Sequence, residues 1–140
     1  MAYVEGELGE KIQNLMDESN EQWDKGEYRK SIDLLIEAWN ELPDDKVQYD
    51  ESYLIVWGIL DISILTNDIV TMNEWVDKVF VADPGRGDTG EREMWAGRVA
   101  YESNEMNKAK EYFEIANKKS KGRCFGDNDE KYKSFYRQNK

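Results

Sequence analysis

Apolar residues recur at steps of three and four along most of the chain, and this spacing is typical of amphipathic helices. One such run consists of Tyr28, Ile32, Leu35, Trp39 and Leu42. No alternating apolar and polar stretch of useful length is present, so strands are not expected. Turn or stop residues separate the helical stretches, at Gly26, Pro43, Asn67-Asp68, Pro84-Gly85 and Asn104. The sequence therefore predicts an all-α fold.

The pattern also predicts where the helices lie. They are expected at 6–24, 28–41, 49–66, 70–82, 89–103 and 107–119, with a shorter last helix near 128–138. Asp127 or Asn128 would cap that last helix. Short turns favour three antiparallel pairs among the first six helices. The five tryptophans fall one per helix on the first five helices, where they suit packing between helices. At 140 residues, the chain is expected to form one domain over 1–140.

Three segments of the sequence align with one another. They are KGEYRKSIDLLIEAWNELPDD from Lys25, TNDIVTMNEWVDKVFVADPGR from Thr66 and SNEMNKAKEYFEIANKKSKGR from Ser103. Each segment has a turn residue at its second position: Gly26, Asn67 or Asn104. Five residues later stands Ser31, Met72 or Ala109; twelve later, Ala38, Val79 or Ala116; and seventeen later, Pro43, Pro84 or Lys121. The segments thus indicate an internal repeat.

These positions resemble the tetratricopeptide repeat, a helix–turn–helix unit of about 34 residues with small residues where its helices cross and a proline at its end. The resemblance implies a right-handed stack of three antiparallel helix pairs. Its units would cover roughly 6–43, 48–84 and 89–121, followed by a capping helix at 127–138. Ser19 and Gly97 match the small crossing position of the first helix, whereas the second pair has Leu60 there. Pro43 and Pro84 are 41 residues apart, so the second unit is longer than the family norm.

The same resemblance implies that the first helix of each pair lines a concave binding groove. The corresponding residues are Met16 and Asn20, then Trp57 and Asp61, then Met94, Arg98 and Tyr101, with Trp23, Ile64 and Glu102 as neighbours. Met16, Trp57 and Met94 suit a helix core as well as a groove. Asp61 interrupts the apolar run YLIVWGILDISIL, and an unpaired buried carboxylate is costly. We therefore expect Asp61 to face the groove or a partner such as Arg98.

One kind of ligand is disfavoured by the same comparison. Family members that clamp the acidic tails of chaperones use lysine, arginine and asparagine in the groove. Asn20 matches that set, but the other clamp positions hold Met16, Gly58, Glu91 and Trp95. An acidic tail is therefore not the expected ligand.

The sequence shows no catalytic constellation. It contains no histidine, which removes the commonest general base and a common zinc ligand. The segment DPGRGDTG lacks the lysine and hydroxyl residue of a phosphate loop, and Asp127-Asn128-Asp129 lacks the spaced ligands of a calcium loop. We expect no enzyme activity, no metal and no cofactor. An enzyme using carboxylates alone would need a deep pocket around Asp61.

The charge and the apolar content limit which kinds of partner the chain is expected to bind. The net charge is −11, and residues 1–60 carry −10 while residues 108–140 carry +5. An acidic chain repels nucleic acid and can steer a basic protein. The longest apolar run has 13 residues, short of the roughly 20 that span a membrane. The single cysteine, Cys124, fits a reducing compartment, so we expect a cytoplasmic protein. From the charge and the short apolar run, we expect no nucleic-acid partner and no membrane partner.

The sequence thus favours a non-enzymatic protein–protein interaction module that binds a protein or peptide, most simply a basic one, in a concave helical groove. An immunity-type inhibitor that masks a basic toxin is one form of such a module. The alternative is a structural or assembly protein that self-associates through an exposed apolar helix face. The expected oligomeric state is a monomer or a weak homodimer.

Overall fold

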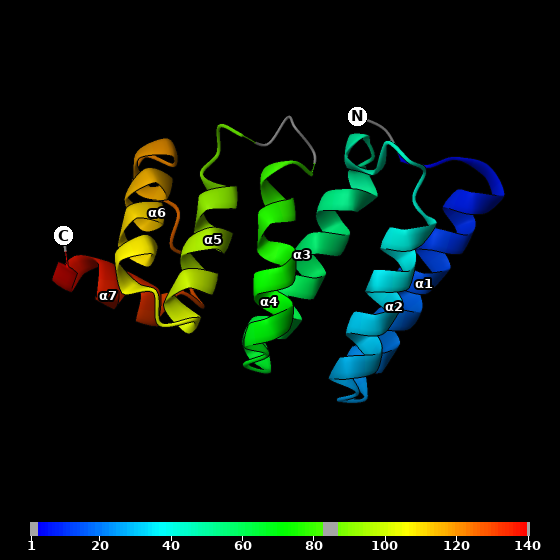
Figure 1. The fold of residues 1–140 in the computed structure, drawn as a ribbon, viewed down its shortest axis with the longest axis horizontal. Helices are drawn as coiled ribbons and strands as arrows, with labels where there is room; N and C mark the ends of the chain where they lie inside the picture. Colours follow the sequence, from blue (N-terminus) through cyan, green and yellow to red (C-terminus); the bar gives the residue numbers. More distant parts are fainter. Residues whose placement is uncertain (1–2, 83–86, 140) are drawn as a thin grey trace. The chain divides into compact units, whose positions relative to one another are not determined.

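The computed structural model describes residues 3–82 and 87–139, and all regular structure within them is helical (Figure 1). The α-helices are α1 (Gly6–Asp24), α2 (Tyr28–Glu41), α3 (Asp50–Leu65), α4 (Ile69–Trp75), α5 (Glu91–Glu102), α6 (Met106–Lys119) and α7 (Glu130–Asn139). Short 3-10 helices cover Lys46–Gln48 and Val76–Phe80. The predicted all-α class is confirmed.

The contacts divide the chain into two compact units, Met1–Pro84 and Gly85–Lys140, called the N-terminal and C-terminal units below. The sequence predicted one domain over 1–140. The boundary between the two units falls at the end of the second predicted repeat, 48–84. The N-terminal unit therefore contains α1 to α4, and the C-terminal unit contains α5 to α7.

Three tight turns close α1, α3 and α5 with the same backbone geometry. Gly26, Asn67 and Asn104 adopt left-handed φ angles of 77°, 56° and 61°. Each donates its N–H to the carbonyl three residues earlier, and the next residue donates to the carbonyl five residues before it. Glycine and asparagine are the residues that accept this conformation most readily at a helix end. The sequence thus sets the ends of these three helices locally.

In the N-terminal unit, α1 packs on α2, α2 on α3, and α3 on α4. The side chains of Ile12, Ile32, Ile59 and Met72 are fully buried. The α-helical part of α4 ends at Trp75, and the chain continues as a 3-10 helix, although the sequence predicted one helix over 70–82.

Asp68 caps α4, because its carboxylate accepts a hydrogen bond from the Thr71 N–H at 3.1 Å. The hydrogen bond from the Thr71 hydroxyl is the main cause that lowers the pKa of Asp68.

In the C-terminal unit, α5 packs on α6 and α6 on α7 around a core rich in aromatic residues. Gly97 permits the close crossing of α5 and α6, because a Cβ there would lie 2.5 Å from the Phe113 ring. The helix α7 begins at Glu130, two residues later than the predicted 128. Asp129, rather than Asp127 or Asn128, therefore precedes it, and its carboxylate accepts a hydrogen bond from the Gly126 N–H.

Candidate protein-binding pocket

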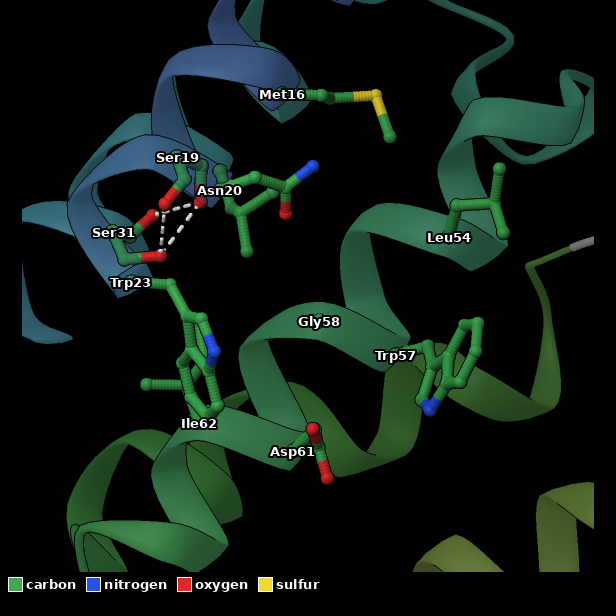
Figure 2. Close-up of a pocket in the computed structure, with 11 residues that line it drawn as sticks. Met16, Ser19, Asn20, Trp23, Ser31, Leu54, Trp57, Gly58, Asp61 and Ile62 are labelled. Atoms are coloured by element: carbon green, nitrogen blue, oxygen red, sulfur yellow. Dashed lines mark hydrogen bonds between the residues drawn. The ribbon is translucent and has the colours of Figure 1, made fainter. Parts of the chain in front are cut away.

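The N-terminal unit contains an open pocket with a volume of ≈ 410 Å³ (Figure 2). Side chains of α1 and α3 form its walls, and α2 contributes to its base. The lining residues are Met16, Ser19, Asn20, Trp23, Ser31, Leu35, Leu54, Trp57, Gly58, Asp61 and Ile62. All four groove residues predicted in this half of the chain, Met16, Asn20, Trp57 and Asp61, are among them.

The α1 wall is a stripe of side chains about one helical turn apart. Met16 and Asn20 are four residues apart, and Trp23 follows three residues later, so the three share one face of the helix. The indole of Trp23 packs edge-on against the ring of Tyr28, with the ring centroids 5.1 Å apart. This contact fixes the aromatic end of the wall.

The α3 wall explains the interrupted apolar run of the sequence. Ile55, Val56, Ile59 and Leu60 are buried, so most of the helix circumference lies in the core. Trp57 and Asp61, one turn apart, are exposed on the remaining face, and the Trp57 side chain is 45% accessible to solvent. In Figure 2 the Asp61 carboxylate lies at the edge of the pocket, between Trp57 and Trp23 in this view. The carboxylate is tolerated in this helix because it reaches solvent.

The base of the pocket is formed where α1 crosses α2. The Ser19 hydroxyl donates to the Ser31 carbonyl, and the Ser31 hydroxyl donates to the Ser19 carbonyl, each at 2.8 Å. These hydrogen bonds use both hydroxyl protons inside the protein. Opposite them, Gly58 has no side chain, and a Cβ there would lie 2.9 Å from Leu35 Cδ1. Asn20 and Asp61 are the other polar side chains of the lining, apart from the indoles.

The three groove residues predicted in the C-terminal unit have different surroundings. Met94 is 2% exposed and belongs to the core, so its side chain presents no open surface. Tyr101 packs edge-on against Tyr132 and Phe135 of α7, with ring centroids 5.2 Å and 5.3 Å apart. In this unit the predicted groove face is therefore covered by the chain's own last helix.

Arg98 is held by Asp129 rather than by Asp61, the partner considered from the sequence. Its Nε donates to Oδ1 of Asp129 at 3.0 Å, and its Nη2 donates to Oδ2 at 2.9 Å. The guanidinium also lies over the Trp95 ring, 4.6 Å from the centroid. The Arg98 guanidinium thus makes a two-point contact with a carboxylate of its own unit.

The sequence did not single out Leu35, Leu54 or Ile62 as lining residues. Leu54 precedes Gly58 by four residues and shares its helix face, and this spacing was an available signal. Leu35 reaches the pocket from α2, which the resemblance assigns to the scaffold rather than to the groove. Its position depends on how α2 packs against α3.

The two units differ in charge. The N-terminal unit holds 20 acidic and 6 basic residues, a net charge of −14. The C-terminal unit holds 10 acidic and 13 basic residues, a net charge of +3. The pocket therefore lies in a strongly acidic unit, whose field attracts cations.

Other chemical features are few in the described parts of the chain. No group of three or more His, Cys, Asp and Glu residues in 3–82 and 87–139 is placed to hold a metal ion. In the same residues, no helix has the length and apolar content needed to cross a membrane. Burial raises the pKa of the Cys124 thiol, so the reactive thiolate is disfavoured.

Comparison with known protein families, with curated proteins and with solved structures finds no match to this chain. The fold and the site therefore define only a class: an all-helical protein with an open pocket, lined by apolar and aromatic side chains and one carboxylate.

Proposed function

We propose that the chain is a non-enzymatic protein-binding module that takes a segment of a protein partner into the pocket between α1 and α3. The observation that carries the proposal is the exposed indole of Trp57 beside a preformed pocket of ≈ 410 Å³. Tryptophan is among the residues that contribute most to binding energy at protein interfaces. While no partner is bound, the exposed part of the indole leaves apolar area in contact with water, and a partner would bury that area. Met16 adds a flexible side chain that can adapt to a ligand.

We further propose that the helix pairs form a tetratricopeptide-like stack with α7 as its cap. Three observations support this. The turns at Gly26, Asn67 and Asn104 share the same hydrogen bonds. Ser31, Met72 and Ala109, each five residues after its turn residue, are buried. Ala38, Val79 and Ala116, each twelve residues after it, are fully buried. In such a stack, the first helices of the pairs would line one concave surface, and the pocket residues of α1 and α3 would lie on it.

Charge favours a basic partner. A unit with a net charge of −14 accelerates encounter with a basic protein, and salt weakens that attraction. Association rates should therefore fall between about 0.05 and 0.5 M salt, while dissociation rates change less. This follows because long-range steering acts mainly on encounter.

Selection of peptides from a displayed random library against the full chain tests the proposal. Affinities of the selected peptides are then measured by calorimetry for the parent chain and for Trp57→Ala. We expect a loss of about tenfold or more, as for a central aromatic at an interface. Val70→Ala is the matched control, because Val70 is an exposed apolar residue of α4 outside the pocket. A library that yields no peptide sensitive to Trp57→Ala would overturn the proposal.

Self-association is the second candidate. It is favoured by exposed apolar side chains on the N-terminal unit, namely Leu65, Val70 and Val81. Sedimentation across protein concentration separates the two candidates. A mass that rises with concentration and returns to that of one chain in Val70→Lys supports assembly, whereas a constant mass of one chain removes it.

A further inference from the structure

The C-terminal unit shows how the groove-side face of a helix can be covered. From the segment leading into α7, Asp129 pairs with Arg98 of α5 through two hydrogen bonds. Three residues later, Tyr132 packs against Tyr101 of α5. The covering segment thus supplies one charged and one aromatic side chain three positions apart.

Arg98 and Asp61 occupy the same position relative to their turns. Arg98 precedes Asn104 by six residues, and Asp61 precedes Asn67 by six. Met94 and Trp57 each precede the same turn residues by ten. Because these turns share their hydrogen bonds, the positions correspond on α5 and α3. The charge, however, is inverted: a guanidinium on α5 corresponds to a carboxylate on α3.

The surroundings of Asp61 suit a cation. The exposed Trp57 indole lies one turn away on the same helix face, and both residues line the pocket. A lysine or arginine can place its charge against the carboxylate while its stem or its charged group lies on the indole. The chain itself places a cation over an indole elsewhere, since Arg98 lies over Trp95 and Lys78 Nζ lies 4.8 Å from the Trp75 ring centroid.

We infer that the occupant of the pocket is a segment of a separate basic protein that places one lysine or arginine against Asp61 and Trp57. The contact of this basic side chain with Asp61 is the charge-inverted counterpart of the Asp129–Arg98 contact. The inference rests on the proposed function and adds the chemistry of the ligand.

The test uses peptides selected from the displayed library against the full chain. We expect enrichment of Lys or Arg at one position of the selected peptides. Replacing that basic residue by norleucine, which keeps the stem and removes the charge, should weaken binding by about tenfold. Asp61→Asn should weaken binding of the parent peptide by the same factor. It should not further weaken binding of the norleucine peptide.

Charge reversal gives a second readout. A library selected against Asp61→Lys should enrich Asp or Glu at the position that was basic, as Arg98 selects Asp129 in the C-terminal unit. Glu10→Lys is the matched control: it changes the net charge equally on an exposed part of α1 outside the pocket. It should slow association slightly and still select basic peptides.

The outcomes separate the inference from the proposed function. Peptides whose binding requires Trp57 but tolerates norleucine would overturn the basic ligand and leave the protein-binding module standing. No Trp57-dependent peptide at all would remove both. Sedimentation that shows dimers abolished by Asp61→Lys would identify a second copy of this chain as the occupant and would also overturn the inference.

Discussion

The helices α3 and α5 carry corresponding residues in two different environments. On α3, Trp57 is 45% exposed and lines a pocket, whereas on α5 the corresponding Met94 is 2% exposed in a core. Asp61 is exposed, whereas Arg98 is partly buried against Asp129. The difference is that α7 covers the face of α5. Exposure at these positions is therefore decided by the covering segment rather than by the helix itself.

This contrast separates two roles for the same helix face. Where the chain supplies its own cover, the aromatic and charged residues contribute to the stability of the folded unit. Where a pocket stays open, an exposed residue such as Trp57 keeps surface that can contribute to binding. Substitutions on the covered face should therefore reduce stability, and substitutions on the open face should reduce affinity while leaving stability nearly unchanged.

The largest difference is expected between Phe113→Ala and Trp57→Ala. Phe113 is fully buried, and its ring packs near those of Phe125, Tyr132 and Phe135. Truncation to alanine should reduce the free energy of unfolding by about 3–5 kcal/mol. Trp57→Ala should cost less, about 1 kcal/mol, because nearly half of this residue is already exposed to solvent.

Denaturant unfolding of the full chain, followed by circular dichroism, measures both variants. Hydrogen exchange of segments within 87–139 assigns the Phe113 loss to the C-terminal unit. Equal destabilisation by the two substitutions would contradict the division into a covered and an open face.

The next largest effect is expected at the contact that holds α7 against α5. Arg98 and Asp129 have side-chain exposures of only 18% and 9%. Arg98→Ala leaves the Asp129 carboxylate without its guanidinium partner and removes the contact with Trp95, so we expect a loss of about 2–4 kcal/mol. Amides of Glu130–Asn139 should exchange faster than in the parent chain.

Lys118→Ala is the control for that substitution. Lys118 pairs with Glu114 at 3.9 Å on the same unit, but both side chains are more than half exposed. Removing such a pair should change stability by less than about 0.5 kcal/mol. If Lys118→Ala released α7 as much as Arg98→Ala, the Arg98–Asp129 contact would not be what holds it.

The sequence was sufficient for features set by local chemistry. The helical class, the turns at Gly26, Asn67 and Asn104 and the shared stripe of Met16 and Asn20 all follow from spacing and from residues that tolerate left-handed backbone. The exposure of Asp61 follows from the cost of burying a carboxylate.

Other features depend on contacts between residues far apart in the sequence. Nothing near Arg98 in the sequence identifies Asp129, 31 residues away, as its partner. Met94 belongs to a core cluster that includes Tyr132 and Tyr136 of α7, and no helical periodicity encodes how α7 joins that cluster. The change from α-helix to 3-10 helix after Trp75 likewise left no signal in the spacing of apolar residues.

A third test compares the two glycines at helix contacts. In Gly97→Ala, the new Cβ would lie 2.5 Å and 2.6 Å from two atoms of the buried Phe113 ring. The ring must move within a packed core, so we expect a loss of about 1–3 kcal/mol despite the better helix propensity of alanine. In Gly58→Ala, the nearest atom is the tip of the Leu35 side chain at 2.9 Å, beside the pocket.

Leu35 can move toward the open space, and the propensity gain of about 1 kcal/mol offsets the contact, so Gly58→Ala should be close to neutral. Thermal unfolding of both variants checks the difference. A larger loss at Gly58 than at Gly97 would show that the pocket wall is packed as tightly as the C-terminal core.

The smallest effect is expected from the Tyr132 hydroxyl, and it depends on pH. Burial, and then the hydrogen bond that Tyr132 donates to Glu102 at 2.9 Å, raises the pKa of this phenol above its ordinary value of 10.0. The unfolded chain then releases this proton at lower pH than the folded chain, so the contribution to stability is complete below pH 10 and falls as pH rises beyond it.

Tyr132→Phe should cost about 0.5–1.5 kcal/mol at neutral pH, because it removes one hydrogen bond. The same variant should lose less stability than the parent chain between pH 10 and 11, where unfolding is measured by denaturant titration. Tyr3→Phe, at an exposed tyrosine of the N-terminal unit, is the control and should leave the pH dependence unchanged. If the parent chain and the Tyr132→Phe variant lost the same stability at alkaline pH, this phenol would not contribute to the stability of the covered face.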